Sequence, residues 1–323
     1  MMRSLLCTMV GVAGVLTAAN LALRPRLFGE GAISTPADET GFALTPDGKT
    51  AFFSVRSGQT ASPTVDVLCV SRLRNGRWTE PEVAPFSGRY RDVGPAVSPD
   101  GAKLFFGSNR PMETGDRRDF NLWYIDLAGD WKTPHPVPGA VNSPGQEFGV
   151  SVATNGTLYF ASNRPGGKGA YDLYRSRLVN GSYAEPENLG PPINTEGFEL
   201  APAVSPDERI LVFEGLGRSD EITGVHREYN KGDLYVSRFE NGSWTAPCNA
   251  GPAVNSGAGE SAPFFTADGK SLFFVSERGF ATLRPPRALD YRTIDSLLSK
   301  TLNGMGNVFE IAATALDGAR CPQ

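Results

Sequence analysis

The sequence predicts an all-β fold, a five-bladed β-propeller of four-stranded blades, and three observations lead to it. One short turn recurs five times, each copy is followed by the same succession of apolar strands, and the last copy stops short of its outermost strand. The turn is typified by Ser98-Pro99-Asp100-Gly101, and its central residues are Asp47, Asp100, Asn155, Asp207 and Asp268. Successive copies are 53, 55, 52 and 61 residues apart, a period that suits one propeller blade.

Each repeat contains the same strands in the same order. The turn itself is a hairpin signal, because the glycine of Asp-Gly or Asn-Gly reaches positive φ without strain. The strand after the turn is apolar in every copy, at residues 51–53, 104–106, 158–160, 211–213 and 272–274. The next strand opens with an acid or an amide, at Asp66, Asn121, Asp172, Asp233 and Asn307. A second turn and an aromatic residue follow in the first four copies, at Trp78, Trp131, Tyr183 and Trp244.

The fifth repeat indicates how the ring closes. It ends at Gln323, with no aromatic residue and no room for an outermost strand. In the other repeats a hydrophobic residue and a small polar one precede the next acid at a fixed distance, at Phe86-Ser87, Val141-Asn142, Ile193-Asn194 and Val254-Asn255. Ile33 and Ser34 occupy the same register before Glu39. We therefore expect residues from about 26 to 34 to form the outer strand of the last blade, since closure removes exposed sheet edges.

The repeat resembles that of a known family. Its Ser98-Pro99-Asp100-Gly101 turn, its Phe105-Phe106 with Ser108-Asn109-Arg110-Pro111, and its Asp172-Leu173-Tyr174 are similar to the WD-like, or PD, repeat of the TolB family and its periplasmic relatives. The resemblance runs from about residue 26 to the end of the chain. It implies an exported propeller that binds peptides, proteins or components of the cell envelope. TolB carries a further N-terminal domain with no counterpart here, so its role in the Tol system is not carried over.

The N-terminal residues predict export. Arg3 supplies the positive charge and residues 5–18 the apolar stretch of a signal peptide, with small residues as cleavage points up to Ala22. The stretch is short for a membrane-spanning helix, and an uncleaved N-terminal anchor is the alternative. We expect residues 1–22 to be the signal peptide, residues 23–323 to form one propeller domain, and the protein to be periplasmic or secreted.

The cysteines fit an exported protein without settling a disulfide. Cys69 lies within an apolar strand and is expected to be a buried small hydrophobic residue. Cys248 and Cys321 could pair in an oxidising compartment. The sequence alone leaves this bridge open.

Composition and motifs argue against several function classes. A net charge of −4 provides no basic face for nucleic acid, and two histidines exclude a multi-histidine metal site. The chain has no Gly-x-Ser-x-Gly elbow, no Cys-x-x-Cys and no phosphate-binding glycine loop. We therefore predict no cofactor, no metal, no nucleic-acid partner and no catalytic residue, and contact with a membrane only through an uncleaved N-terminal segment.

One charged pattern recurs in every repeat. Eight residues before the central residue of each turn is an acid, namely Glu39, Asp92, Glu147, Glu199 and Glu260. An arginine closes the strand after the turn, namely Arg56, Arg110, Arg164, Arg218 and Arg278. We expect the acids to open the innermost strands around the mouth of the central channel, each paired with the arginine of its own blade. The favoured interpretation is a structural fastening, and the alternative is a site for a cation or polar ligand.

Function is expected where the repeat is irregular. The loop before the third strand is long in the fourth repeat, residues 214–232, and in the fifth, residues 279–306. Among these rim inserts the predicted ligand-binding residues are Asp220, Glu221, His226, Arg227, Tyr229 and Tyr291. The spacing of leucine and isoleucine predicts a helix over residues 288–302, either a lid on the channel or one wall of a cleft.

Two functions from different classes are compatible with this sequence. The favoured one is a non-enzymatic scaffold that binds a protein, peptide or glycan of the cell envelope at the rim formed by the inserts. The alternative is a carbohydrate-active hydrolase or lyase that uses rim carboxylates such as Glu147, Glu199 or Glu260. We expect the arginine partners to lower the pKa values of these carboxyls, which is unfavourable for a general acid.

Overall fold

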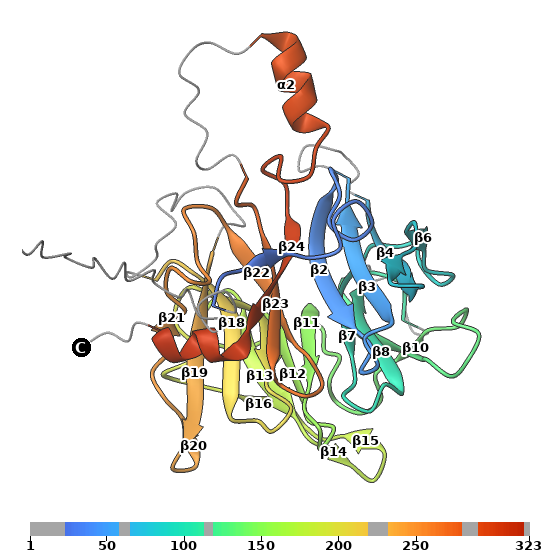
Figure 1. Ribbon diagram of the computed structural model, residues 1–323. Helices are drawn as coiled ribbons and strands as arrows, with labels where there is room; N and C mark the ends of the chain where they lie inside the picture. The colour runs from blue at the N-terminus through green and yellow to red at the C-terminus, as the bar shows by residue number, and fades with distance from the viewer. Residues whose placement is uncertain (1–22, 58–64, 113–118, 219–231, 280–289, 320–323) are drawn as a thin grey trace, which may run out of the picture.

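The computed structural model describes residues 23–57, 65–112, 119–218, 232–279 and 290–319. It confirms the predicted propeller, because five antiparallel sheets form a ring and each runs outward from an innermost strand (Figure 1). Neighbouring innermost strands contact one another all the way around, including the last and the first.

The five blades follow the five sequence repeats. Blade 1 contains β2 (Asp38–Leu44), β3 (Thr50–Arg56), β4 (Asp66–Arg74), β5 (Arg77–Trp78) and β6 (Glu82–Val83). Blade 2 contains β7 (Asp92–Val97), β8 (Lys103–Ser108), β9 (Asn121–Asp126) and β10 (His135–Pro136). Blade 3 contains β11 (Glu147–Val152), β12 (Leu158–Ser162), β13 (Asp172–Ser176), the hairpin of β14 (Leu178–Val179) and β15 (Ser182–Tyr183), and β16 (Glu187–Asn188).

The last two blades complete the ring. Blade 4 contains β17 (Phe198–Val204), β18 (Ile210–Leu216), β19 (Asp233–Glu240), β20 (Ser243–Trp244) and β21 (Cys248–Asn249). Blade 5 contains β22 (Glu260–Phe265), β23 (Ser271–Ser276), β24 (Asn307–Ala312) and, from the other end of the chain, β1 (Arg26–Leu27).

The hydrophobic core lies between neighbouring blades. The second strand of every blade contributes a fully buried phenylalanine, at Phe52, Phe106, Phe160, Phe213 and Phe274. Phe52 packs in one cluster with Phe106 of the next blade, while Phe53 packs with Phe273 of the preceding one. Successive side chains of a strand point to opposite faces. The adjacent residues Phe52 and Phe53 therefore pack against different neighbours of blade 1, namely blade 2 and blade 5. Burying each such ring stabilises the fold by about 1.5–3 kcal/mol.

The ring closes through the N-terminal segment, as predicted, but with a shorter strand. β1 pairs with β24, with Leu27 opposite Phe309, and Ile33 is fully buried. Ser34 Oγ accepts a hydrogen bond from the backbone N–H of Val308 at 3.0 Å and donates to its carbonyl at 3.2 Å. The expected strand as far as Ser34 does not form, because Gly29 and Gly31 adopt positive φ (60° and 82°) and turn the chain.

The same bracket of two hydrogen bonds recurs in blades 2, 3 and 4 and establishes the register of the closure. The side-chain amides of three asparagines each accept from one backbone N–H and donate to the carbonyl of the same residue, in the pairs Asn142–Leu122, Asn194–Leu173 and Asn255–Leu234. Ser34 therefore binds the third strand of blade 5 in the way that these asparagines bind the third strands of blades 2, 3 and 4.

The described residues contain two helices. The 3-10 helix η1 (Ala313–Gly318) follows β24 and buries Leu316. The helix α2 (Tyr291–Leu298) is shorter than the predicted 288–302, beginning after Asp290, whose carboxylate caps it by accepting from the Thr293 N–H at 2.8 Å. No residue of α2 is buried, and the helix projects away from the rim of the propeller (Figure 1).

Export and disulfide formation concern segments at the two ends of the chain. Residues 1–22, the predicted signal peptide, lie outside the described part of the chain. Within the described part, no helix combines the length and apolarity needed to cross a bilayer. Cys69 is free and buried, as expected. Cys248 is disulfide-bonded, and Cys321, the partner that the sequence left open, lies outside the described residues.

Candidate functional site

The five repeated acids open the innermost strands or stand one residue from their start, yet their carboxyls are enclosed. Each has a relative exposure of 0%. A hydroxyl from the chain entering the blade donates to each carboxylate, from Thr35, Ser87, Ser143, Thr195 and Ser256. They are therefore buried junctions between blades and not an open ring of charge at the channel mouth.

Four of the five arginines pair with the acid of their own blade. The separations are 2.7 Å for Arg110–Asp92, 3.2 Å for Arg164–Glu147, 3.1 Å for Arg218–Glu199 and 3.2 Å for Arg278–Glu260. The same guanidinium groups donate to the backbone carbonyls of Phe86, Val141, Ile193 and Val254. Each arginine thus joins its blade to the segment arriving from the preceding blade, a use of two donors that lysine would perform less well.

Blade 1 departs from this pattern, and the expected Arg56–Glu39 pair is wrong. Arg56 pairs with Asp66 at 2.8 Å, while Glu39 accepts from Asn307 Nδ2 of blade 5 at 2.9 Å. The spacing differs: Arg56 is the third residue after Phe53, whereas Arg110, Arg164 and Arg278 are each the fourth after the corresponding phenylalanine. In blade 4 Arg218 is the fifth, but Gly217 before it adopts positive φ (82°). A shift of one residue in a strand turns the side chain to the opposite face, and for Arg56 that face is the central channel.

The pKa values of these carboxyls also differ from expectation. Burial raises the pKa of Glu39 to about 7, outweighing its hydrogen bonds to Thr35 and Asn307. Burial likewise raises the pKa of Glu260, although Arg278 acts in the opposite direction. The expectation of a pKa lowered by the arginine partner, which concerned Glu147, Glu199 and Glu260, is therefore wrong for Glu260, because the loss of hydration outweighs the effect of Arg278.

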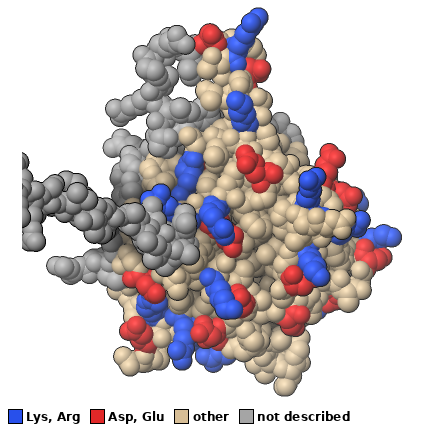
Figure 2. Space-filling view, viewed as in Figure 1, with Lys and Arg blue, Asp and Glu red and all other residues tan. Residues whose placement is uncertain are grey.

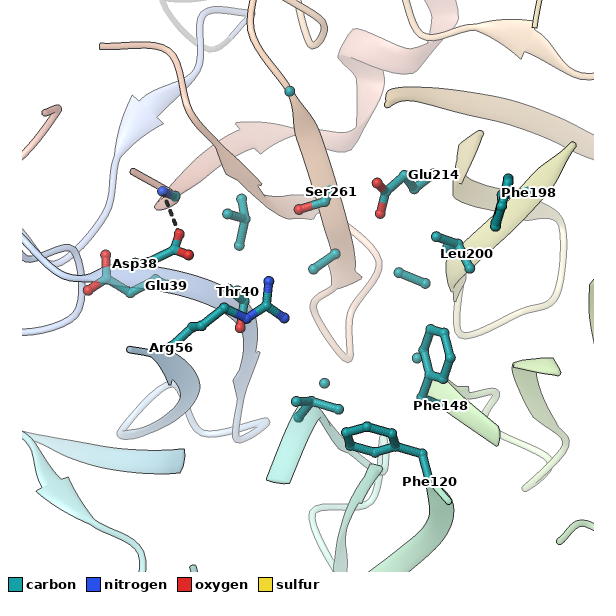
Figure 3. A pocket seen from close by; sticks show the side chains of 18 of the residues that line it. Asp38, Glu39, Thr40, Arg56, Phe120, Phe148, Phe198, Leu200, Glu214 and Ser261 are labelled. Carbon is teal, nitrogen blue, oxygen red and sulfur yellow. Dashed lines mark hydrogen bonds between the residues drawn. The ribbon is translucent and has the colours of Figure 1, made fainter. Parts of the chain in front are cut away.

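The central channel opens at this rim into a cavity of about 510 Å³. Its wall is made mainly by residues beside the repeated acids and by the ends of the second strands (Figure 3). Gly94 and Gly149 line it at positive φ (59° and 61°). A Cβ atom at Gly149 would lie 2.8 Å from the Cα of Ala201 on the next inner strand, so the inner strands nearly touch at this level and narrow the channel.

One side of the cavity is aromatic. Ring centroids are 6.3 Å apart for Phe120–Phe148, 5.1 Å for Phe148–Tyr171 and 6.2 Å for Tyr171–Phe198. These four residues, here called the aromatic arc, come from blades 2, 3 and 4 and line the wall together. Offset and edge-to-face contacts of this kind hold rings in place before any ligand arrives.

The other side is charged. The charged arc consists of Asp38, Arg56, Arg91, Glu214 and Glu277. Arg56 and Arg91 share the carboxylate of Asp66, at 2.8 and 2.7 Å. Asp38 accepts from the Gly306 N–H at 3.0 Å, and burial raises its pKa.

Two buried polar groups of this wall, the Glu214 carboxyl and the Thr40 hydroxyl, differ from the rest. Burial, reinforced by the charge of Glu277, raises the pKa of Glu214 to about 8. The hydroxyl of Thr40 is buried without a hydrogen-bond partner among the residues described. A buried polar group without a partner is costly, which suggests that this wall is arranged to meet a ligand or ordered water.

The residues predicted from the irregular loops contribute little to this cavity as described. Asp220, Glu221, His226, Arg227 and Tyr229 lie outside the described residues. Tyr291 is described, on α2, where it is 80% exposed and not part of the cavity wall.

The arcs could have been found from the repeat itself. The residues directly flanking each repeated acid point the other way along the strand and line the channel; examples are Asp38, Phe148 and Phe198. The acid shared by all five repeats is easily recognised in the sequence. Its neighbours differ between blades, and these variable residues line the cavity.

Fold and cavity together define a five-bladed β-propeller with a ligand-sized pocket at one end of its channel. No protein-family model and no curated protein matches the chain. Among solved structures, the chain is similar to a provisionally assigned TolB from Agrobacterium tumefaciens, with 17% identity, a TM-score of 0.47, and coverage of 86% of this chain and 91% of that one. At this identity the similarity concerns the fold alone.

Hydrolases are also among the similar structures. A puromycin-hydrolysing peptidase from Mycobacterium tuberculosis has 12% identity and a TM-score of 0.43, with coverage of 84% of this chain but 41% of that one. A gluconolactonase from Xanthomonas campestris has 12% identity and a TM-score of 0.44, with coverage of 80% and 90%. At these identities the similarity concerns the fold.

Proposed function

We propose that this protein is an exported, non-enzymatic propeller that binds a peptide or protein segment of the cell envelope in the pocket at the end of its channel. The observation that carries the proposal is the division of the pocket wall into an aromatic arc and a charged arc. Export rests on the signal-like residues 1–22.

The aromatic arc supplies most of the affinity in this proposal. Its rings are packed against one another and need little ordering on binding, which lowers the entropic cost of complex formation. A side chain that enters a cavity of about 510 Å³ would be largely removed from water, as in typical ligand sites. The charged arc then orients the polar backbone or termini of the segment.

The surface around the pocket is compatible with a protein partner. Figure 2 shows acidic and basic side chains interspersed over the face in view, with no large area of one sign. Such a mixed surface favours a partner that is recognised by shape and by the pocket, because it provides no strong electrostatic attraction to a polyanion.

The test is a binding screen on the protein from residue 23 onward. An array of short peptides identifies binders, and fluorescence anisotropy measures their affinities for the wild type, Phe148→Ala and the control Phe239→Ala on blade 4. Phe239 is 37% exposed and outside the pocket wall. We expect Phe148→Ala to weaken binding at least tenfold, about 1.4 kcal/mol or more, as for a buried aromatic hot spot. Equal affinities for all three proteins would overturn the proposal.

A carbohydrate-active hydrolase is the second candidate, and one observation favours it. Glu214, with its raised pKa, faces a pocket that also contains the carboxyls of Asp38 and Glu277. A protonated carboxyl near an ionised one is the arrangement that glycosidases require. Turnover of any oligosaccharide by the wild type, lost in Glu214→Gln while the melting temperature is retained, would establish this function and reject the non-enzymatic one.

A further inference from the structure

Glu214 differs in its surroundings from the repeated acids of the propeller. It lies on β18 opposite Leu200 of the inner strand, is 7% exposed, and points into the pocket (Figure 3). Within the part of the chain that the structure describes, its carboxyl has neither a hydrogen-bond nor an ion-pair partner. The repeated acid of the same blade, Glu199, is by contrast bound by Thr195 and Arg218.

The groups that face Glu214 are of both signs. Glu277 of blade 5 lies near enough to disfavour its ionisation, and Arg56 of blade 1 favours ionisation from across the pocket. Among the described residues, Asp38, Glu39, Arg91 and the phenol of Tyr171 complete the titratable and charged groups of the wall. The positive charges of Arg56 and Arg91 are already directed to Asp66, so neither arginine forms an ion pair with Glu214.

We propose that the pocket selects a ligand with an organic cation, a primary ammonium or a guanidinium, next to an apolar or aromatic group, and that Glu214 is the counter-ion of this cation. The inference rests on the proposed function, because it names the chemistry that the same pocket would bind. In a peptide, a lysine, an arginine or a free N-terminus beside a hydrophobic residue has this character.

Two physical arguments favour a cation over an anion or a neutral group. The aromatic arc ends at Phe198, on the inner strand that pairs with the strand of Glu214, and the faces of aromatic rings attract cations more strongly when water is excluded. An anion would meet Glu277 and would have to compete with Asp66 for the two arginines. A neutral ligand would leave the Glu214 carboxyl without a partner.

Binding of a cation should release a proton. The raised pKa of Glu214 means that its O–H bond is intact in most molecules at pH 7. When the ammonium binds, this bond breaks, the electron pair stays on the carboxylate and the proton passes to the buffer. Affinity for the cation should therefore rise with pH through about 8, where Glu214 is half ionised, and level off above it.

The first experiment compares three probes that share a phenethyl group and carry a positive, a neutral and a negative end group: phenethylamine, phenethyl alcohol and 3-phenylpropanoate. NMR titration at pH 8 measures each dissociation constant for the wild type, Glu214→Gln and the matched control Glu240→Gln, an exposed acid of the same blade. We expect the amine to bind at least tenfold more tightly than the alcohol to wild type and control. In Glu214→Gln the amine should bind like the alcohol, with alcohol binding unchanged.

The outcomes separate this inference from the proposed function. Equal binding of amine and alcohol to the wild type overturns the cation selectivity but leaves the pocket as a site for aromatic groups. Absence of saturable binding by all three probes counts against both. Tighter binding of the carboxylate probe than of the amine would reverse the assignment and point to Arg56 and Arg91.

Proton release provides a second readout, which does not depend on the comparison of the three probes. Calorimetry with phenethylamine at pH 7, in phosphate and in Tris, yields the number of protons released from the difference between the two enthalpies. We expect roughly one proton for the wild type and none for Glu214→Gln, and roughly a tenfold rise in affinity from pH 6 to pH 7. A wild type that binds the amine with no proton release and no pH dependence would reject Glu214 as the counter-ion.

Discussion

Blade 1 and the other four blades are built on the same repeat but use their arginine for different purposes. In blades 2 to 5 the arginine binds the buried acid of its own blade and a carbonyl of the incoming chain. In blade 1 the acid Glu39 is bound by Asn307 of blade 5, and Arg56 faces the channel. The comparison shows that an arginine one residue earlier in the strand lines the pocket, whereas at the later position it binds the buried acid of its blade.

The closure between blades 5 and 1 also differs from the other junctions, because no peptide bond joins the two blades there. Removal of residues 23–34 takes away β1, the buried Ile33 and the Ser34 bracket. Loss of a buried side chain of this kind alone costs about 2–5 kcal/mol. We therefore expect a chain starting at residue 35 to show no cooperative thermal transition by circular dichroism.

A chain starting at residue 23 is the control for this deletion and should melt like the full-length protein. If the chain starting at residue 35 keeps the same melting temperature, the assignment of the closure is wrong.

The two kinds of arginine can be compared directly. Arg164→Met leaves the fully buried Glu147 without its cation, and breaking a buried pair in this way costs about 3–5 kcal/mol. Arg56→Met leaves Asp66 with Arg91, and for a partly exposed pair the cost is about 0–1 kcal/mol. Urea denaturation at pH 7 measures both. A similar loss of stability for the two variants would contradict the distinction between fastening and pocket arginines.

The stability of the protein should also depend on pH through Glu39 of blade 1. Because the pKa of Glu39 is about 7 in the folded protein and 4.5 in the reference state, the folded protein binds more protons between these values, and stability falls as pH rises from about 4.5 to 7. The cost at pH 8 is about 3 kcal/mol at most.

The variants Glu39→Gln and Glu147→Gln compare a buried acid that has no arginine partner with one that is paired with an arginine. Glu39→Gln removes the charge that burial disfavours, so it should be more stable than the wild type at pH 8 and close to it at pH 5. Glu147→Gln leaves Arg164 without a counter-ion and should be destabilised at both pH values. Denaturation midpoints at the two pH values provide the comparison, and a stabilised Glu147→Gln at pH 8 would refute it.

The smallest effect is expected on α2. Leu298 is 51% exposed, so Leu298→Ser should change the free energy of unfolding by no more than about 0.5 kcal/mol. Leu316→Ser, at a fully buried position of η1, is the contrasting change and should cost several times more. A large destabilisation by Leu298→Ser would mean that α2 packs against the propeller in solution.

Much of the architecture was predictable because it is repeated. The five turns, the strand order and the register of Ser34 follow from local residue types whose spacing recurs along the chain. The buried bracket around Val308 has the same form as those around Leu122 and Leu173. The extents of β1 and α2 were less predictable, since positive φ at Gly29 and Gly31 and the cap at Asp290 decide where these elements begin and end.

The sequence by itself determined the number of blades, the closure through the N-terminus and the acid–arginine fastening of blades 2 to 5, because each depends on a local pattern present several times. Only the tertiary structure decided which side chains meet at the end of the channel. Phe148, Phe198, Arg56 and Glu214 come from three blades, and their meeting depends on which face of a strand each occupies. The raised pKa of Glu214 depends on burial by neighbours that are distant in sequence.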